Sequence, residues 1–302
     1  RFAKQLGIPV FYYISPKVWV WRRERIELFR RYVDHMAVVF PFEPQFLATH
    51  GFARVSYVGH PLLDRIEAGA VTAPKTMLAD MNVPQDSTTL ALMLGSRRSE
   101  IDKHIGPALA AVRLLKEQVP NLHVLVPVAS SISRKRIEED THESWIQLID
   151  GRRAHEVLQR ADIGLIKSGT SNLEAALFGL PFVMYYIAHP ITALIVTQVI
   201  QRIRAIPHYS IVNWIRPGTV REVVQREATA ERLAKETLRL IVDERARERL
   251  RRDLGEVKDS LHVPVKRVGE ASTTVAQRVA ELVLTTAGAD ASSENQRIAV
   301  GS

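Results

Sequence analysis

Short apolar runs rich in β-branched residues alternate along this chain with longer amphipathic runs of helical length. This alternation is typical of βαβ units, in which helices cover a parallel sheet. It predicts strands at 10–14, 36–40, 90–94, 123–126, 145–149, 163–166 and 182–185. Helices are predicted at 22–32, 99–118, 131–139, 151–160, 170–178, 191–203 and about 269–284, with further charged helices in 219–259. The fold class is therefore α/β, with two doubly wound parallel sheets.

A small, turn-rich stretch at 67–74 (EAGAVTAP) separates two such series and predicts a domain boundary. We expect one Rossmann-like domain over 1–70, a second over 71–260, a C-terminal helix at 261–286 and a disordered tail at 287–302. The first seven residues read as the end of a helix without an initiator Met, so we expect further sequence upstream and an incomplete first domain. Two tandem units of this kind predict a cleft between them, with ligands at the carboxyl ends of the strands.

Composition excludes several classes of protein. Hydrophobic residues make up 46% and charged residues 25% of the chain, as in a soluble globular protein. The absence of cysteine excludes disulfides, thiolate metal sites and a cysteine nucleophile, and no zinc-type spacing appears, so we predict no metal site. No apolar run reaches the length of about 18 residues that a membrane-spanning helix needs.

The net charge of +8 is concentrated near the N-terminus. Residues 1–35 hold eight Lys and Arg against three Asp and Glu, interleaved with aromatic residues. Such a face suits an anionic partner, either an acidic membrane surface or a phosphorylated substrate, although a solvated basic helix stays an alternative. No nucleic-acid motif accompanies it, so nucleic acid is not a predicted partner.

The segment SGTSNLE (168–174) joins an apolar strand to an apolar helix. Ser168, Gly169 and Thr170 form a small-residue turn at a helix N-terminus, where free backbone N–H groups attract anions. Glu174 follows one turn later, where its carboxylate could accept hydrogen bonds from sugar hydroxyls. This combination favours a nucleotide. The alternative is a capped helix, with Ser168 or Thr170 as the N-cap and Glu174 completing a capping box.

A second turn at a strand end carries a cation. Gly95 lets backbone approach a phosphate, and Ser96 and Arg97 follow it at the start of a helix. The alternative is an ordinary loop with a solvated arginine. Both glycine turns of the second series therefore fall where nucleotides bind in doubly wound folds.

The first series offers candidates for the other side of a cleft. Ser15, Trp19, Trp21 and Arg22 follow a strand, and such aromatic and basic side chains could accept a sugar and its phosphate. Large aromatics at strand ends also fill cores, so burial is the alternative. His60 could pair with Asp64 on a helix or act as a structural cap. The helix at 191–203 has an apolar stripe with basic flanks, which suits either a core or a membrane surface.

Taken together, these motifs resemble the lipid-A-disaccharide synthase family, inverting glycosyltransferases of the GT-B fold. The resemblance rests on the ordered strings SPKVWVWR (15–22), PFEPQF (41–46), VGHPLLD (58–64), LGSRRSE (94–100) and SGTSNLE (168–174). Looser matches are YYIAHPIT (185–192), IVN (211–213) and QREATAERLA (225–234). The order and spacing agree over nearly the whole chain.

The resemblance implies a hexosyltransferase of lipid A biosynthesis. It would transfer 2,3-diacylglucosamine from its UDP derivative to 2,3-diacylglucosamine 1-phosphate, at the inner face of the cytoplasmic membrane as a peripheral protein, without a metal or redox cofactor. Gly95, Ser96 and Arg97 would contact the UDP phosphates, Glu174 the ribose, and Asn213 would lie near the nucleotide. Assembly as a homodimer is open.

The chain departs from the family pattern at Leu94, Lys167, Tyr186–Ile187 and Ile211–Val212, where Pro, Ala, Tyr-Arg and Leu-Pro are usual. The family's candidate general base, an Asp early in the first domain, falls upstream of this chain. We therefore expect the chain as given to bind UDP weakly or not at all and to show no turnover. Two alternatives are another GT-B enzyme of UDP-sugars, such as a UDP-N-acetylglucosamine transferase or epimerase, and a diverged non-catalytic protein that binds anionic lipid or nucleotide.

Overall fold

The computed structural model describes residues 1–68, 81, 83–188, 207–263 and 274–288. The chain divides into two compact units. The first unit comprises Arg1–Gly69 together with Asp259–Ser302, and the second unit comprises Ala70–Lys258.

The second unit is built on a six-stranded sheet whose strands are all parallel. Its strands are β4 (Thr88–Met93), β5 (Leu122–Val128), β6 (Ile146–Asp150), β7 (Ile163–Lys167), β8 (Phe182–Tyr186) and β9 (Arg221–Val224). Their spatial order is β6-β5-β4-β7-β8-β9. The chain thus winds outward from β4 in one direction and, after returning to β7, outward in the other, which is the doubly wound arrangement.

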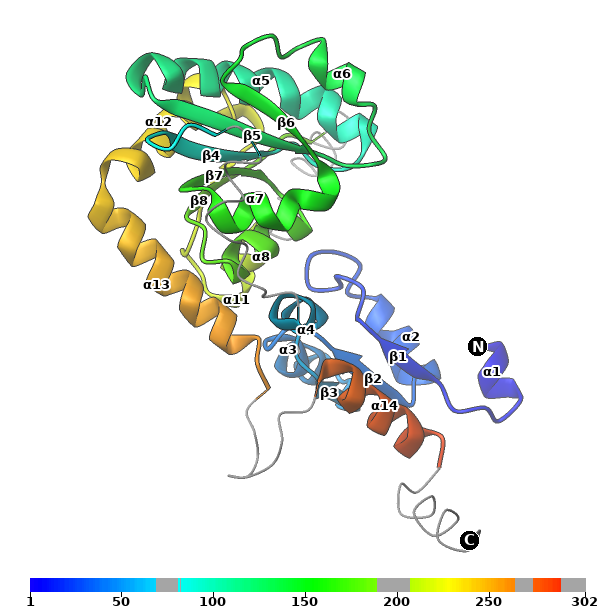
Figure 1. Cartoon of the computed structure of the whole chain (residues 1–302). Helices are drawn as coiled ribbons and strands as arrows, with labels where there is room; N and C mark the ends of the chain where they lie inside the picture. Colours follow the sequence, from blue (N-terminus) through cyan, green and yellow to red (C-terminus); the bar gives the residue numbers. More distant parts are fainter. Residues whose placement is uncertain (69–80, 82, 189–206, 264–273, 289–302) are drawn as a thin grey trace, which may run out of the picture. The chain divides into compact units, whose positions relative to one another are not determined.

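Helices cover both faces of this sheet (Figure 1). On one face α5 (Arg98–Gln118) packs against α12 (Ala230–Val242), which also contacts β7 and β8. On the other face lie α7 (Ala154–Arg160) and α8 (Thr170–Leu177), with α11 (Ile211–Ile215) against α8. The remaining elements are α6 (Arg134–Glu138), the 3₁₀ turns η2 (Gly151–Arg153) and η4 (Gln225–Glu227), and the long α13 (Glu244–Ser260).

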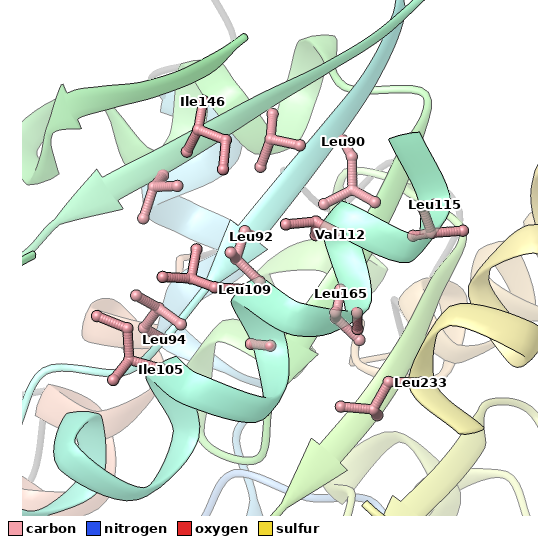
Figure 2. Close-up of a cluster of buried hydrophobic side chains, with 14 of the residues drawn as sticks. Leu90, Leu92, Leu94, Ile105, Leu109, Val112, Leu115, Ile146, Leu165 and Leu233 are labelled. Carbon is pink, nitrogen blue, oxygen red and sulfur yellow. The ribbon is translucent and has the colours of Figure 1, made fainter. Parts of the chain in front are cut away.

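Alternation along the central strand separates two apolar cores. Leu90 and Leu92 of β4 join one cluster with Leu109 of α5, which Figure 2 shows beside the strand. Ala91 and Met93, the residues between and after them, belong to the cluster on the opposite face. Successive side chains of a strand point to opposite faces, so a strand buried on both sides is apolar throughout. These two cores fix the ends of β4 and β7, on which the site depends.

The first unit contains a parallel sheet of order β1-β2-β3. Its elements are α1 (Phe2–Gln5), β1 (Phe11–Tyr13), α2 (Arg25–Tyr32), β2 (His35–Val38), α3 (Glu43–Thr49), β3 (Val55–Tyr57), α4 (Pro61–Ala68) and α14 (Val275–Thr286). The predicted α/β class with two parallel sheets is therefore confirmed.

The C-terminal helix α14 belongs to this first unit, although it is distant in sequence. It contacts α4, β1 and β2. Its backbone N–H at Val275 donates to Asp64 Oδ2 at 2.7 Å, and Arg278 Nε donates to the Val58 carbonyl at 2.8 Å. A capping box between Thr274 and Gln277 begins the helix. The sequence predicted it as a separate segment, because local periodicity carries no information on where a helix docks.

Two strands were not predicted, and one prediction is wrong. Residues 221–224, assigned to charged helices, form the edge strand β9. This strand alternates exposed Arg221 with buried Val223, but its four residues are too short a signal beside the charged helices that follow. β3 is likewise short and only partly buried. The predicted helix at 191–203 lies outside the described residues.

Candidate functional site

The candidate site lies at the carboxyl ends of β4 and β7, which are neighbours in the sheet. The chain leaves these two strands in opposite directions, toward β5 and toward β8. Loops that diverge in this way leave space above the strand ends, where doubly wound folds bind their ligands. Both glycine turns singled out in the sequence, at Gly95 and Gly169, start here and lead into α5 and α8.

Helix α8 begins without a side-chain cap. Its N-cap is Gly169, which has no side chain to cap the first turn. The Ser168 hydroxyl instead donates to the Tyr209 carbonyl at 2.9 Å, which ties this turn to the segment before α11. The capped-helix alternative is therefore wrong for this helix. The Asn172 N–H of the first turn donates to the Gly169 carbonyl at 3.2 Å, and the positive end of the helix dipole can still attract an anion.

Helix α5 starts in the same way one strand over. Its N-cap is Arg97, again without a side-chain cap hydrogen bond. Gly95 precedes it with φ of +103°, and a Cβ there would lie 3.1 Å from Glu100 Oε2. The positive φ favours glycine, and the space beside it is tight. Two helix N-termini without side-chain caps therefore begin on adjacent strand ends.

Three charged side chains connect the two turns. Glu100 lies between two cations, with Oε1 3.1 Å from Arg97 Nη1 and Oε2 2.8 Å from Lys167 Nζ. Burial alone would raise the pKa of Glu100, but hydrogen bonds and charges from Lys167 and Arg97 outweigh it and lower that pKa. The Arg97 side chain is 79% exposed, so its charge faces solvent. With one carboxylate between two cations, this cluster of three side chains carries net positive charge.

Glu174 lies one turn into α8, as predicted from the sequence. Its Oε1 is 3.3 Å from His155 Nε2 of α7, and most of its side chain is covered. His155 in turn packs against the Phe178 ring at 5.3 Å between centroids. This contact orients the carboxylate and leaves its other lone pairs free to accept hydrogen bonds.

Asn213 takes a structural position instead of an open one. It is 3% exposed, and its amide nitrogen donates to the Val220 carbonyl at 2.9 Å and to Glu222 Oε1 at 2.8 Å. Its oxygen accepts from the Val220 N–H at 2.9 Å. Because both amide hydrogens are used within the chain, Asn213 has none to donate to a nucleotide. Sequence reasoning could not see this, since the partner Glu222 lies on the strand that was not predicted.

His104 was not singled out from the sequence, although it fixes the start of α5. Its Nε2 accepts from the Ile187 N–H at 2.9 Å, so Nδ1 carries the hydrogen and donates to the Glu100 carbonyl at 2.5 Å. Burial lowers the pKa of His104, and the ring is neutral. The sequence showed only a histidine on the apolar face of a predicted helix. Such a position does not by itself distinguish a structural role from a functional one.

The departures from the family pattern are of two kinds. Leu94 and Val212 are buried in the cores, and Ile187 and Ile211 pack against them. These apolar residues add no chemistry to the site. Lys167 differs, because it brings a charge to the end of β7.

The aromatic candidates of the first unit are divided by burial. Trp19 is 3% exposed and packs edge-on against Phe40 and Phe42, with ring centroids 5.9 and 5.3 Å away. It is a core residue, which corrects its prediction as a sugar contact. Trp21 is 50% exposed, and the Arg22 guanidinium lies 4.4 Å from the centre of its ring. This pair can still meet a ligand.

The other two candidates of the first unit are partly or fully covered. The Ser15 hydroxyl is buried and donates to the Pro16 carbonyl at 3.0 Å. His60 accepts from the Leu62 N–H through Nδ1 at 3.2 Å, and burial lowers its pKa to about 4. Its position matches the structural cap that was the alternative. Asp64 accepts instead from Val275.

In the described part of the chain, no three His, Asp or Glu side chains gather as metal ligands. No helix described here has the length and apolar character needed to cross a membrane.

Comparison with known proteins identifies the family. The family model described as lipid-A-disaccharide synthetase matches residues 2–272. The lipid-A-disaccharide synthase of Anaeromyxobacter dehalogenans (strain 2CP-C) is 37% identical over 265 residues, which is 86% of this chain and 67% of that protein. The Paraburkholderia phytofirmans enzyme of the same name is 36% identical over 93% of this chain and 68% of its own length. The chain thus spans about two thirds of these relatives.

Solved structures share the fold at low sequence identity. A UDP co-structure of Staphylococcus aureus MnaA matches with a TM-score of 0.64 and 16% identity, over 95% of this chain and 72% of that one. A UDP-N-acetylglucosamine 2-epimerase from Neisseria meningitidis, bound to UDP-N-acetylglucosamine, gives 0.60 and 15%, over 94% and 71%. These likenesses show the GT-B type of fold alone. By its sequence, the chain belongs to the lipid-A-disaccharide synthase family, the hexosyltransferases of lipid A biosynthesis.

Proposed function

We propose that the second unit holds the UDP part of a UDP-diacylglucosamine donor, and that the whole protein transfers its 2,3-diacylglucosamine to 2,3-diacylglucosamine 1-phosphate. One observation carries this proposal. Two helices without side-chain caps, α5 and α8, begin at adjacent strand ends, with a basic side chain at the first and a carboxylate one turn into the second. Such a pair of N-termini suits a diphosphate.

The roles follow from the chemistry of each group. Backbone N–H groups beside Gly95, Ser96, Gly169 and Thr170 bind the phosphate oxygens, and Arg97 offers a bidentate partner. Glu174 accepts hydrogen bonds from the ribose hydroxyls. Charge built up on the leaving UDP is stabilised by the two helix N-termini, which lowers the barrier to breaking the sugar–phosphate bond. A general base from elsewhere in the protein takes the proton of the attacking hydroxyl.

Kinetics of the whole protein that contains this chain test these roles. With both diacylglucosamine substrates and product detection by mass spectrometry, Arg97→Ala and Glu174→Ala should each lower kcat/KM at least about tenfold, or about 1.4 kcal/mol. Glu117→Ala, on an exposed part of α5, serves as the control and should match the wild type. Unchanged kinetics for either variant removes that residue from the site. Faster turnover with a non-acylated UDP-sugar would indicate the alternative GT-B activity.

We further propose that the protein acts at the inner face of the cytoplasmic membrane, where acylated substrates lie. The support is a set of exposed apolar side chains near the N-terminus. Eight of the eleven large hydrophobic residues that are exposed in the described part of the chain fall within its first 28 residues. They are interleaved with basic residues, which suits anionic headgroups. Binding to anionic vesicles, described in the Discussion, tests this proposal. Homodimer formation stays a prediction, which sedimentation of the whole protein tests.

A further inference from the structure

Lys167 is the last residue of β7 and is 8% exposed. Lysine is seldom buried unless it is paired, because removing an ammonium group from water is costly. Its partner is Glu100 Oε2, 2.8 Å from Nζ. This ion pair joins the end of β7 to the first turn of α5, the helix that follows the neighbouring strand β4. The question is whether the buried charge only joins these elements or also serves a ligand.

The position of the side chain bears on this question. Its Nζ lies 3.8 Å from where a Cβ on Gly169 would be, and its Cδ lies 3.3 Å from where a Cβ on Gly95 would be. The stem therefore fills the space beside the first glycine turn, and the ammonium reaches the second. Nζ also lies 5.7 Å from the centre of the Tyr186 ring. A Cβ at either glycine would meet the lysine, so the two turns and the ammonium group share one small region.

The hydrogen-bonding capacity of the ammonium group is only partly used by this carboxylate. An ammonium group has three N–H donors, and Glu100 Oε2 takes one of them. Glu100 also faces Arg97 through its other oxygen, so its single negative charge is shared between two cations. A dianionic diphosphate that reached both helix N-termini would find positive charge still available. Since Lys167 is held in place beforehand, it loses little conformational freedom on binding, unlike the exposed Arg97.

We propose that Lys167 is a phosphate-binding cation of the nucleotide site, held at the two glycine turns by Glu100 before the ligand arrives. This inference rests on the proposed nucleotide site in the second unit. It states that Lys167 binds the phosphates of the ligand and not its uridine. The contribution of Lys167 should therefore be seen with UDP and be missing with uridine.

Titration of the whole protein that contains this chain with UDP and with uridine, followed by ligand-observed NMR up to millimolar concentrations, tests the inference. Lys167→Met keeps the apolar stem and removes the charge. It should weaken UDP binding at least about tenfold and leave uridine binding unchanged. The control is Lys235→Met, which removes an exposed lysine of α12 and should bind both ligands as the wild type does. If Lys167→Met does not fold, Lys167→Gln, which retains a hydrogen-bond donor for Glu100, is measured instead.

The outcomes separate the role of Lys167 from the proposed nucleotide site itself. If wild type and Lys167→Met bind UDP equally, the ion pair is structural and the inference is overturned, while the nucleotide site stands. An equal loss of UDP and uridine binding also overturns it, because a general disturbance of the loops would explain that result. If the wild type binds UDP no better than uridine, both the proposed phosphate site and the role of Lys167 are overturned.

Discussion

Glu43 lies almost fully buried in the first unit, and one of its oxygens accepts hydrogen bonds from the backbone N–H groups of Val39 and Phe40, at 3.1 and 2.8 Å. Burial raises the pKa of Glu43 to about 7 and outweighs these two hydrogen bonds, which act to lower it. At the scale of single residues, burial therefore shifts the protonation of this carboxyl group away from that of an exposed glutamate. The sequence identified this segment as part of a motif but could not reveal its desolvation.

The raised pKa predicts a pH-dependent stability with a definite sign. Below the ordinary pKa near 4.5 the carboxyl group is neutral in both states. As the pH rises toward 7, the unfolded chain loses the proton first, so the stability of the folded state falls. Over this interval of about 2.5 pKa units the loss is at most about 3.4 kcal/mol. Glu43→Gln should remove this decline, as measured by urea unfolding at several values between pH 5 and 8.

An exposed carboxylate provides the matched control. Glu117→Gln, on α5, should keep the decline of the wild type, because that side chain is solvated in both states. If the stability of Glu43→Gln declines as steeply as that of Glu117→Gln, the carboxyl group of Glu43 is not the titrating group.

At the scale of elements, a hydrogen-bonded turn connects α11 to β9 and to the proposed nucleotide site. Glu222 on β9 accepts from the backbone N–H groups of Tyr209 and Ser210, at 2.9 and 3.0 Å, and from the amide of Asn213. The carbonyl of Tyr209 in turn accepts from Ser168. A short edge strand that sequence patterns did not predict thus supports the turn before α8.

Removing the buried amide should destabilise this part of the fold. Asn213→Ala leaves the buried Val220 N–H and carbonyl without their Asn213 partner and removes one of three hydrogen bonds to Glu222, so we expect a loss of roughly 2–4 kcal/mol in the free energy of unfolding. The measurement is denaturant unfolding. Asn121→Ala, which removes one exposed hydrogen bond to the Asp86 carbonyl, should lose less than about 1 kcal/mol. Equal losses in the two variants would contradict the structural role of Asn213.

At the scale of the whole molecule, the chain combines two units with different surfaces. The second unit carries the glycine turns and the ion pairs around Glu100. The first unit carries most of the exposed apolar side chains, among basic residues. The proposed nucleotide site and the proposed membrane surface therefore belong to different units.

Vesicle binding tests the proposed role of that surface. Trp21→Ser removes a half-exposed indole beside Arg22. Because indole rings favour the membrane interface, this variant should lower the fraction of protein that co-sediments with vesicles of anionic phospholipid. Val242→Ser, which removes a more exposed apolar side chain from the second unit, is the control and should sediment like the wild type. The proposal fails if the wild type does not sediment, or if the two variants lose binding equally.

Much of the fold and part of the site could be predicted from the sequence. The strand and helix periods identified the α/β class, and the glycines after two apolar strands identified the turns at Gly95 and Gly169. The sequence left the burial of Trp19 open, and it could not predict the internal hydrogen bonds of Asn213 or the docking of α14. Each of these depends on residues that are far away along the chain.

The sequence by itself determined where strands end, where helices begin and which small residues lie between them, because these properties depend on neighbours along the chain. Only the tertiary structure decided that β4 and β7 are adjacent, so that Lys167 meets Glu100 between two helix N-termini. Strand order is set by burying two apolar faces at once, which no local pattern encodes. Desolvation and pairing of charges follow from that order, and so do the chemical properties of the site.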